Sequence, residues 1–124
     1  MPGRRDVIVV GGGPAGLLAA RDLAASGFST TVFEEHDEIG VPVHCTGVLG
    51  LDAFDELDLP RDTILQIAHA ARFISADGSS LLIDHERVRA AIIDRGSFDA
   101  RLAVNASAAE IGRASCRERV LDHV

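Results

Sequence analysis

Residues 6–34, with the sequence DVIVVGGGPAGLLAARDLAASGFSTTVFE, contain the strongest structural signal in the chain. The run 6–10 is short, apolar and rich in β-branched residues, which predicts a strand buried on both faces of a parallel sheet. A glycine-rich turn follows, then a helical pattern over 17–26 and a second strand over 30–33 that ends at Glu34. The order of these elements predicts the βαβ unit of an α/β fold.

The turn between the first strand and the helix carries the spacing G-x-G-x-x-G at Gly11, Gly13 and Gly16. In such a turn the first glycine permits the tight bend, the second lets backbone approach a pyrophosphate, and the third lets the helix pack close to the strand. The pyrophosphate is expected on the free N–H groups at the positive end of the helix. Pro14 falls in the first helical turn, where a missing N–H costs nothing. The turn therefore predicts a dinucleotide-binding site.

An acid at the end of the second strand supports this interpretation. Glu34 follows Gly11 by 23 positions (34 − 11), close to the roughly 20 expected for a carboxylate that accepts from ribose hydroxyls. The alternative is a glycine-rich turn in an unrelated α/β protein, which the full ordered series of elements disfavours. A carboxylate here, with Glu35 beside it, also disfavours NADP, whose 2′-phosphate is usually matched by an arginine. The sequence therefore predicts NAD or FAD as the nucleotide.

The whole-chain properties exclude several classes of protein. With 124 residues the chain has room for one small domain. Its net charge of −7, and an aromatic content of 4% without Trp or Tyr, argue against nucleic-acid binding. The two cysteines have no metal-binding spacing, and no stretch approaches the ~18 apolar residues of a membrane span. We therefore expect a cytoplasmic protein whose membrane contact, if any, is peripheral.

Further along the chain, the pattern departs from plain βα alternation. An Asp-Gly turn between two apolar runs predicts a β-hairpin inserted after the second strand, an arrangement commoner in FAD enzymes than in NAD dehydrogenases. The fold class predicted is thus α/β, a Rossmann-like FAD-binding βαβ unit with an inserted β-hairpin, truncated. In chain order we expect an irregular loop over 39–47 and a short helix over 48–59. The two hairpin strands follow over 68–75 and 80–84. A third strand over 88–93 and a helix over 98–109, capped by Ser97, complete the series.

Three segments together resemble the geranylgeranyl reductase family of flavoproteins, which belongs to the larger group built like p-hydroxybenzoate hydroxylase. They are residues 6–34, the loop Gly40-x-Pro42-x-x-Cys45-x-Gly47, and the helix start Asp94-Arg95-x-x-Phe98-Asp99. The resemblance covers residues 6 to about 109 and implies that residues 1–109 are the N-terminal part of an FAD-binding domain. It further implies that FAD, reduced by an external donor such as NAD(P)H or ferredoxin, saturates carbon–carbon double bonds of isoprenoid or other apolar substrates.

The same resemblance implies roles for individual residues. Cys45, Thr46 and Gly47 would lie near the flavin ring, and Arg95 would reach the cofactor, although a surface position is its alternative. Glu35 and Thr46 depart from the residues common in the family. Cys45 is the candidate catalytic residue, as a proton donor or positioning group, with simple packing beside the ring as the alternative. The remaining cofactor contacts would be the pyrophosphate and ribose contacts Gly11, Gly13, Pro14, Ala15, Gly16, Glu34 and Glu35.

Other polar groups, and the end of the chain, are interpreted differently. His44 could donate a proton, whereas the remaining histidines (His36, His69 and His85) and the acidic run 52–58 are interpreted as solvated surface. Residues 110–120 resemble a translated sequencing adapter, so we expect 110–124 to be a non-native tail, with a genuine charged helix end as the alternative. For function, an FAD-dependent aromatic monooxygenase of the same fold and an inactive truncated fragment remain the alternatives. We expect the chain by itself to be marginally stable and to retain FAD weakly.

Overall fold

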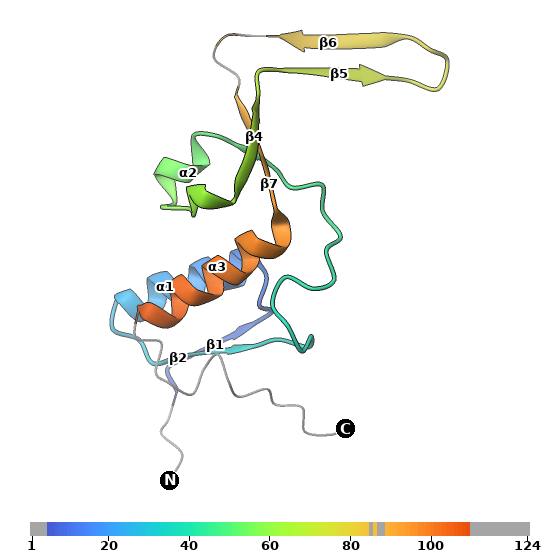
Figure 1. Ribbon diagram of the computed structural model, residues 1–124. Coiled ribbons are helices and arrows are strands. Elements are labelled where there is room, and N and C mark those ends of the chain that lie inside the picture. Colours follow the sequence, from blue (N-terminus) through green and yellow to red (C-terminus); the bar gives the residue numbers. More distant parts are fainter. Residues whose placement is uncertain (1–4, 85, 87–88, 110–124) are drawn as a thin grey trace. The chain divides into compact units, whose positions relative to one another are not determined.

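The computed structural model describes residues 5–84, 86 and 89–109. The chain divides into two compact units, the first drawn from 1–43 and 96–124 and the second from 44–95. Figure 1 labels their helices and strands in chain order. In the described part of the chain, no helix combines the length and apolar character needed to cross a membrane.

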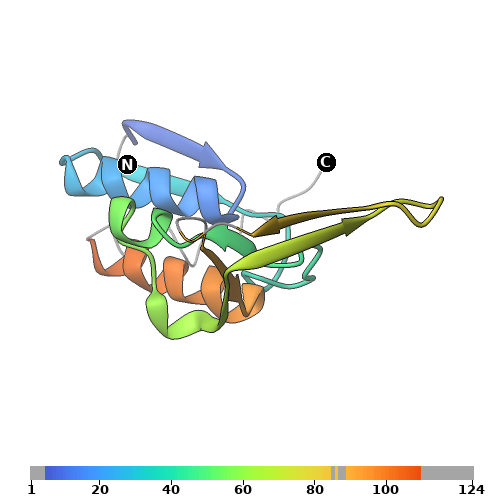
Figure 2. The same ribbon diagram turned by 90° about the horizontal axis from the view of Figure 1, so that it is seen from above.

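The first unit contains the predicted βαβ arrangement. Strand β1 (Val7–Val10) pairs in parallel with β2 (Thr30–Phe33), and helix α1 (Pro14–Ala25) connects them. Helix α3 (Arg95–Ala108) returns to this unit from the end of the second one, and it runs beside α1 in both views (Figures 1 and 2). The predicted Rossmann-like α/β fold is therefore confirmed.

Helices α1 and α3 supply most of the buried apolar side chains of the first unit. Phe98 and Leu102, four residues apart on α3, are each 2% exposed, as their helical spacing predicts. One prediction for β1 is wrong, because Ile8 is 61% and Val10 is 85% exposed. Among the described residues the sheet of this unit has two strands, and α1 contacts both of them. One face of the strand, at Val7 and Val9, is thus half-buried, and the other is largely uncovered.

The second unit is built from antiparallel strands. Its three-stranded sheet has the order β3-β7-β4, and β5 pairs with β6 as a separate hairpin. Two short helical segments lie between β3 and β4 in the sequence. The elements are β3 (Val48–Gly50), α2 (Ala53–Glu56), η1 (Arg61–Thr63), β4 (Ile64–Ala68), β5 (Ala70–Ile74), β6 (Ser80–Asp84) and β7 (Ala90–Ile93).

The turn of the β5–β6 hairpin follows the predicted chemistry. Gly78 has a φ of +84°, and its N–H donates to the Ser75 carbonyl at 3.0 Å. The Asp77 carboxylate accepts from the Ser79 N–H at 2.9 Å and from the hydroxyls of Ser75 and Ser79. These hydroxyls, and then the Ser79 N–H, lower the pKa of Asp77 to about 2. The inserted hairpin is therefore confirmed.

The interval predicted as one helix over 48–59 is a strand followed by a single helical turn. Val48 and Leu49 pair with Ile92 and Ala91 of β7, so β3 takes the first part of the interval. Only α2 remains helical, with Phe54 buried. Strand β4 was not predicted, although it pairs with the same β7 from the other side.

The last strand and helix also differ from the prediction in their bounds. Helix α3 begins at Arg95, so Ser97 lies inside its first turn and does not cap it. Asp94, a residue type favoured before helices, directly precedes the helix. Strand β7 begins at Ala90, whereas residue 88, where that strand was expected to start, lies outside the described residues. The predicted tail at 110–124 also lies outside them.

Candidate dinucleotide-binding site

Each glycine of the first turn meets a different geometric demand. Gly11 has a φ of +103°, which L side chains rarely adopt. A Cβ on Gly16 would lie 2.0 Å from the Gly11 carbonyl oxygen, so only glycine allows α1 to approach β1 this closely. Gly13 is extended (φ −77°, ψ 179°), and a Cβ there would meet nothing within 4 Å. The backbone at Gly13 therefore borders open space, as approach by a ligand requires.

Helix α1 begins at this open point. Pro14 occupies the first helical turn, as predicted, and the Leu17 N–H closes the turn onto the Gly13 carbonyl at 2.9 Å. In the part of the chain that the structure describes, no side chain caps the N-terminus of α1, and its first turn contains no acidic residue. Gly13 and Ala15 are exposed there. The positive end of the helix dipole is thus left accessible to an anion.

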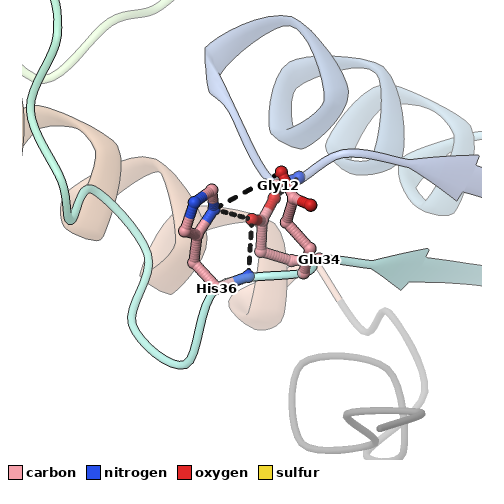
Figure 3. A network of polar contacts seen from close by, with 4 residues as sticks. Gly12, Glu34 and His36 are labelled. Carbon is pink, nitrogen blue, oxygen red and sulfur yellow. Dashed lines mark hydrogen bonds and ion pairs between the residues drawn. The ribbon is translucent and has the colours of Figure 1, made fainter. Parts of the chain in front are cut away.

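The carboxylate of Glu34 lies at the mouth of this turn, as Figure 3 shows. One carboxylate oxygen, Oε2, accepts from the Gly12 N–H at 2.5 Å. The other, Oε1, accepts from the His36 N–H at 2.9 Å and lies 2.6 Å from His36 Nδ1. A Cβ on Gly12 would lie 2.6 Å from Ile39 Cδ1 and 3.1 Å from Glu34 Cβ, so a larger residue here would have to displace the end of the Ile39 side chain and push against Glu34. The structure therefore joins the end of β2 to the glycine turn, as the sequence predicts.

The hydrogen bonds fix the charge of Glu34. The backbone N–H of His36, and next that of Gly12, hold the pKa of the Glu34 carboxyl below its usual value. An ionised carboxylate only accepts hydrogen bonds, so Nδ1 of His36 must carry the hydrogen in its contact with Oε1. Glu34 is therefore an anion whose two oxygens already have protein donors.

A pocket of about 230 Å³ lies beside this network, within the first unit. Its lining residues include the four acids Glu34, Glu35, Glu38 and Asp99. Among the described residues that line it, His36 is the one that can carry positive charge. Such a lining favours hydroxyl donors and disfavours an added phosphate, which supports the predicted preference against NADP. The remaining lining residues are Gly12, Gly13, Ile39, Gly40, Val41 and Pro42.

The two more specific motifs of the resemblance come into contact within each unit. In the first unit, a Cβ on Gly40 would lie 2.8 Å from the Gly96 carbonyl oxygen and 3.2 Å from Asp99 Cβ. In the second unit, a Cβ on Gly47 would lie 2.5 Å from the Ile93 carbonyl oxygen and 3.4 Å from Arg95 Cγ. At both glycines the absence of a side chain therefore allows the loop over 40–47 to lie close to residues near the start of α3.

The candidate catalytic residue lies in the second part of that loop. Cys45 is exposed, and its sulfur accepts from the Gly47 N–H at 3.4 Å. Thr46 and His44 are exposed as well, whereas Arg95 is half-buried, which disfavours the alternative of a plain surface arginine. These residues belong to the second unit and the Glu34 network to the first. Their approach to a common cofactor therefore remains a prediction.

His36 is the site residue that the sequence interpretation missed, since it was assigned to a solvated surface. It is exposed, but its backbone and ring both contact Glu34. Its position in the sequence could have indicated this role. His36 follows Glu34 by two residues, and at that spacing a backbone N–H can donate to the side-chain oxygen of the earlier residue. In the described part of the chain, no three His, Cys, Asp or Glu residues are grouped to hold a metal ion.

Comparison with known proteins decides the family. Residues 9–72 match the profile of a family described as the NAD(P)-binding Rossmann-like domain. The chain belongs to this Rossmann-like family. The matched residues include the glycine turn, α1 and β2, so the dinucleotide-binding interpretation of the first unit is confirmed at the level of the family.

Individual relatives confirm the resemblance to geranylgeranyl reductases. The Rossmann-like chain is 32% identical to a digeranylgeranylglycerophospholipid reductase of Methanoculleus marisnigri, covering 88% of this chain and 28% of that protein. It is 36% identical to the reductase of the same name from Methanocella arvoryzae, covering 88% and 29%. A crystal structure of a geranylgeranyl bacteriochlorophyll reductase-like protein from Thermoplasma acidophilum superimposes with a TM-score of 0.75 at 33% identity, covering 85% and 28%. The chain thus spans less than a third of the length of these relatives.

Proposed function

We propose that this chain is the FAD-binding start of an enzyme that reduces carbon–carbon double bonds of isoprenoid chains. One observation carries the proposal: Glu34, at the end of β2, contacts the Gly12 N–H at 2.5 Å. This contact supports a role of Glu34 as the ribose acceptor, beside the open N-terminus of α1, where a pyrophosphate would bind. The names of the relatives supply the substrate class.

The residues present fit the ADP part of FAD. Gly13 leaves open space for the pyrophosphate, while Gly11 and Gly16 hold the turn and the helix that bear its N–H donors. Pro14 and Ala15 complete the mouth of the helix. The anionic Glu34, with Glu35 beside it, would accept from the ribose. The acidic lining of the pocket supports FAD over a nucleotide that carries a 2′-phosphate.

The reaction itself would use the second unit. Bound flavin would supply a hydride to one carbon of the double bond, taken originally from an external donor such as NAD(P)H or ferredoxin. Cys45, Thr46 and Gly47 would line the flavin ring, and Arg95, beside Gly47, would orient the cofactor by its charge. The Cys45 thiol would position the alkene or donate the proton that completes the reduction. An isoprenoid lipid substrate would bring the enzyme to a membrane surface.

The cofactor assignment is tested on the chain itself. We expect FAD and ADP to bind competitively in a calorimetric or fluorescence titration, and 2′-phospho-ADP to bind at least about tenfold more weakly than ADP because Glu34 would repel the added phosphate. A chain that binds neither FAD nor ADP, or that prefers 2′-phospho-ADP, would contradict the assignment.

The reaction is tested in a chimera. Residues 5–109 replace the matching portion of the Thermoplasma acidophilum protein, which is 33% identical. We expect the purified chimera to retain FAD and, once reduced anaerobically, to add hydrogen to a digeranylgeranyl lipid, detected by mass spectrometry. The unmodified Thermoplasma protein is the control. Oxygen-dependent hydroxylation of an aromatic substrate in place of alkene reduction would favour the monooxygenase alternative.

A further inference from the structure

The Glu34 carboxylate has little acceptor capacity left. Two carboxylate oxygens offer about four lone-pair positions. Three are taken by protein donors: the Gly12 N–H on Oε2, and the His36 N–H and Nδ1–H on Oε1. With the donors of the described residues counted, one position remains, whereas a ribose presents two hydroxyls, at C2′ and C3′. The arrangement in Figure 3 can therefore accept one ribose hydroxyl and not both.

We propose that the His36 ring occupies the acceptor position on Glu34 that the second ribose hydroxyl requires, so that His36 acts as a latch which the ribose displaces. This inference rests on the proposed dinucleotide function. His36 then controls nucleotide binding at that site. Its ring holds the Glu34 carboxylate in place until a ribose hydroxyl of the nucleotide replaces it.

The geometry allows the ring to leave without disturbing the rest of the network. The His36 side chain is 47% exposed, so rotation toward solvent meets little packing, while the Glu34 side chain is 20% exposed. The backbone N–H donors of Gly12 and His36 do not depend on the ring, and they keep the carboxylate oriented after it moves. Only one of the three donors is thus exchangeable, and it is the imidazole.

Protonation strengthens the latch. An imidazolium makes a charge-assisted bond to a carboxylate, which is stronger than that of a neutral ring. The other acids around the ring act in the same direction: Glu35 Oε1 lies 4.0 Å from Nδ1, and Glu38 and Asp99 line the same pocket. We therefore expect the ribose diol to compete less well with a protonated ring than with a neutral one. A positive His36 also attracts the diphosphate, but that attraction is independent of the ribose hydroxyls.

The decisive experiment compares two ligands that differ by one hydroxyl. ADP and 2′-deoxy-ADP are titrated into the 124-residue chain, into the His36→Ala variant and into His69→Ala, which removes an exposed histidine of the second unit as a matched control. The measured quantity is the preference for ADP over 2′-deoxy-ADP, in which the shared electrostatics cancel. We expect His36→Ala to raise this preference about three- to tenfold, the range expected for one hydrogen bond to a carboxylate that is partly screened by solvent. His69→Ala leaves it unchanged.

The pH dependence of the same preference provides a second readout. In the wild type it falls as the solution is acidified, and in His36→Ala it does not change. A third readout uses the wild type alone, so that it does not depend on a variant folding. The imidazole ¹⁵N signals of His36 move toward those of a solvated ring on addition of ADP, and stay in place with 2′-deoxy-ADP.

Failure of this inference can be told apart from failure of the proposed function. If the wild type binds ADP but His36→Ala leaves or lowers the preference, the latch is wrong and the dinucleotide site stands. An imidazole signal that responds equally to both nucleotides leads to the same conclusion. If the wild type binds neither nucleotide, the dinucleotide assignment fails and the latch fails with it.

Discussion

Adding one methyl group at Gly13 should impair ligand binding without impairing folding, whereas adding one at Gly16 should destabilise the fold. A Cβ on Gly16 would lie 2.0 Å from the Gly11 carbonyl oxygen, a full 1.0 Å inside the 3.0 Å that real Cβ contacts keep. That oxygen is backbone in a turn whose φ of +103° is already fixed, so it cannot rotate away. Helix α1 must shift as a body, and Leu17 and Ala20, which are buried, shift with it.

The change in unfolding free energy of Gly16→Ala follows from two opposing contributions. Overpacking of this kind costs up to about 3 kcal/mol, and alanine gains about 1 kcal/mol over glycine inside a helix. We therefore expect Gly16→Ala to lose about 2 kcal/mol of unfolding free energy. At Gly13 a Cβ meets nothing within 4 Å, and the backbone is extended, so Gly13→Ala should be neutral or about 0.4–1 kcal/mol more stable, through a less flexible unfolded state.

The assays are urea unfolding followed by circular dichroism, and titration with FAD. Gly13→Ala should keep or raise its unfolding midpoint and lose FAD affinity by at least about tenfold, because the added methyl stands where the pyrophosphate approaches. Gly16→Ala should show a lower midpoint and a loss of affinity that follows from it. An unchanged FAD affinity in Gly13→Ala would refute the assignment of the pyrophosphate to this turn. An unchanged midpoint in Gly16→Ala would refute the close-packing argument.

Three further substitutions test the chemistry of particular side chains. Glu34→Gln should weaken ADP binding about tenfold by calorimetry, through loss of a charged acceptor. The pKa of the Glu34 carboxyl lies below its usual 4.5. The contribution of Glu34 to the unfolding free energy should therefore be present above pH 4.5 and fade as the pH falls through that lowered pKa. Thr31 is buried, and its hydroxyl has no hydrogen-bond partner among the described residues. Thr31→Val should therefore stabilise the chain by about 1 kcal/mol in urea unfolding, and a loss of stability would contradict this. Asp77 has a pKa of about 2 against an ordinary 3.8, so the stability difference between wild type and Asp77→Asn in thermal melts should hold above pH 4 and shrink toward pH 2.

The parts of the fold that the sequence predicted correctly are those fixed by near neighbours in the chain. Strand β2 has the predicted bounds, because the apolar run ends at a charged residue, and Pro14 begins α1 because proline fits the first helical turn. The hairpin turn needs a positive φ, which Gly78 supplies. In each case the physical constraint acts within a few residues of the signal.

The elements that were predicted wrongly depend on distant partners. Val48 and Leu49 fit a helical pattern together with the residues that follow, but they pair with Ile92 and Ala91, more than forty positions later. A strand partner satisfies their backbone groups in a way that no local pattern reveals. The exposure of Ile8 and Val10 has the same origin, since burial of a parallel strand on both faces depends on elements beyond its own βαβ unit.

The candidate site shows both kinds of constraint in one network. The glycine spacing and the acid at the end of β2 are local signals, and together they predicted that Glu34 would reach the turn, which it does. The sequence could not indicate how many donors the carboxylate would already hold, because that depends on how the chain turns after β2. The turn brings the backbone and the ring of His36 onto one oxygen, so recognition of a ribose there becomes an exchange between a protein donor and a ligand donor. Affinity at this site should therefore depend on how firmly the protein already holds the carboxylate, as well as on the contacts that the nucleotide makes.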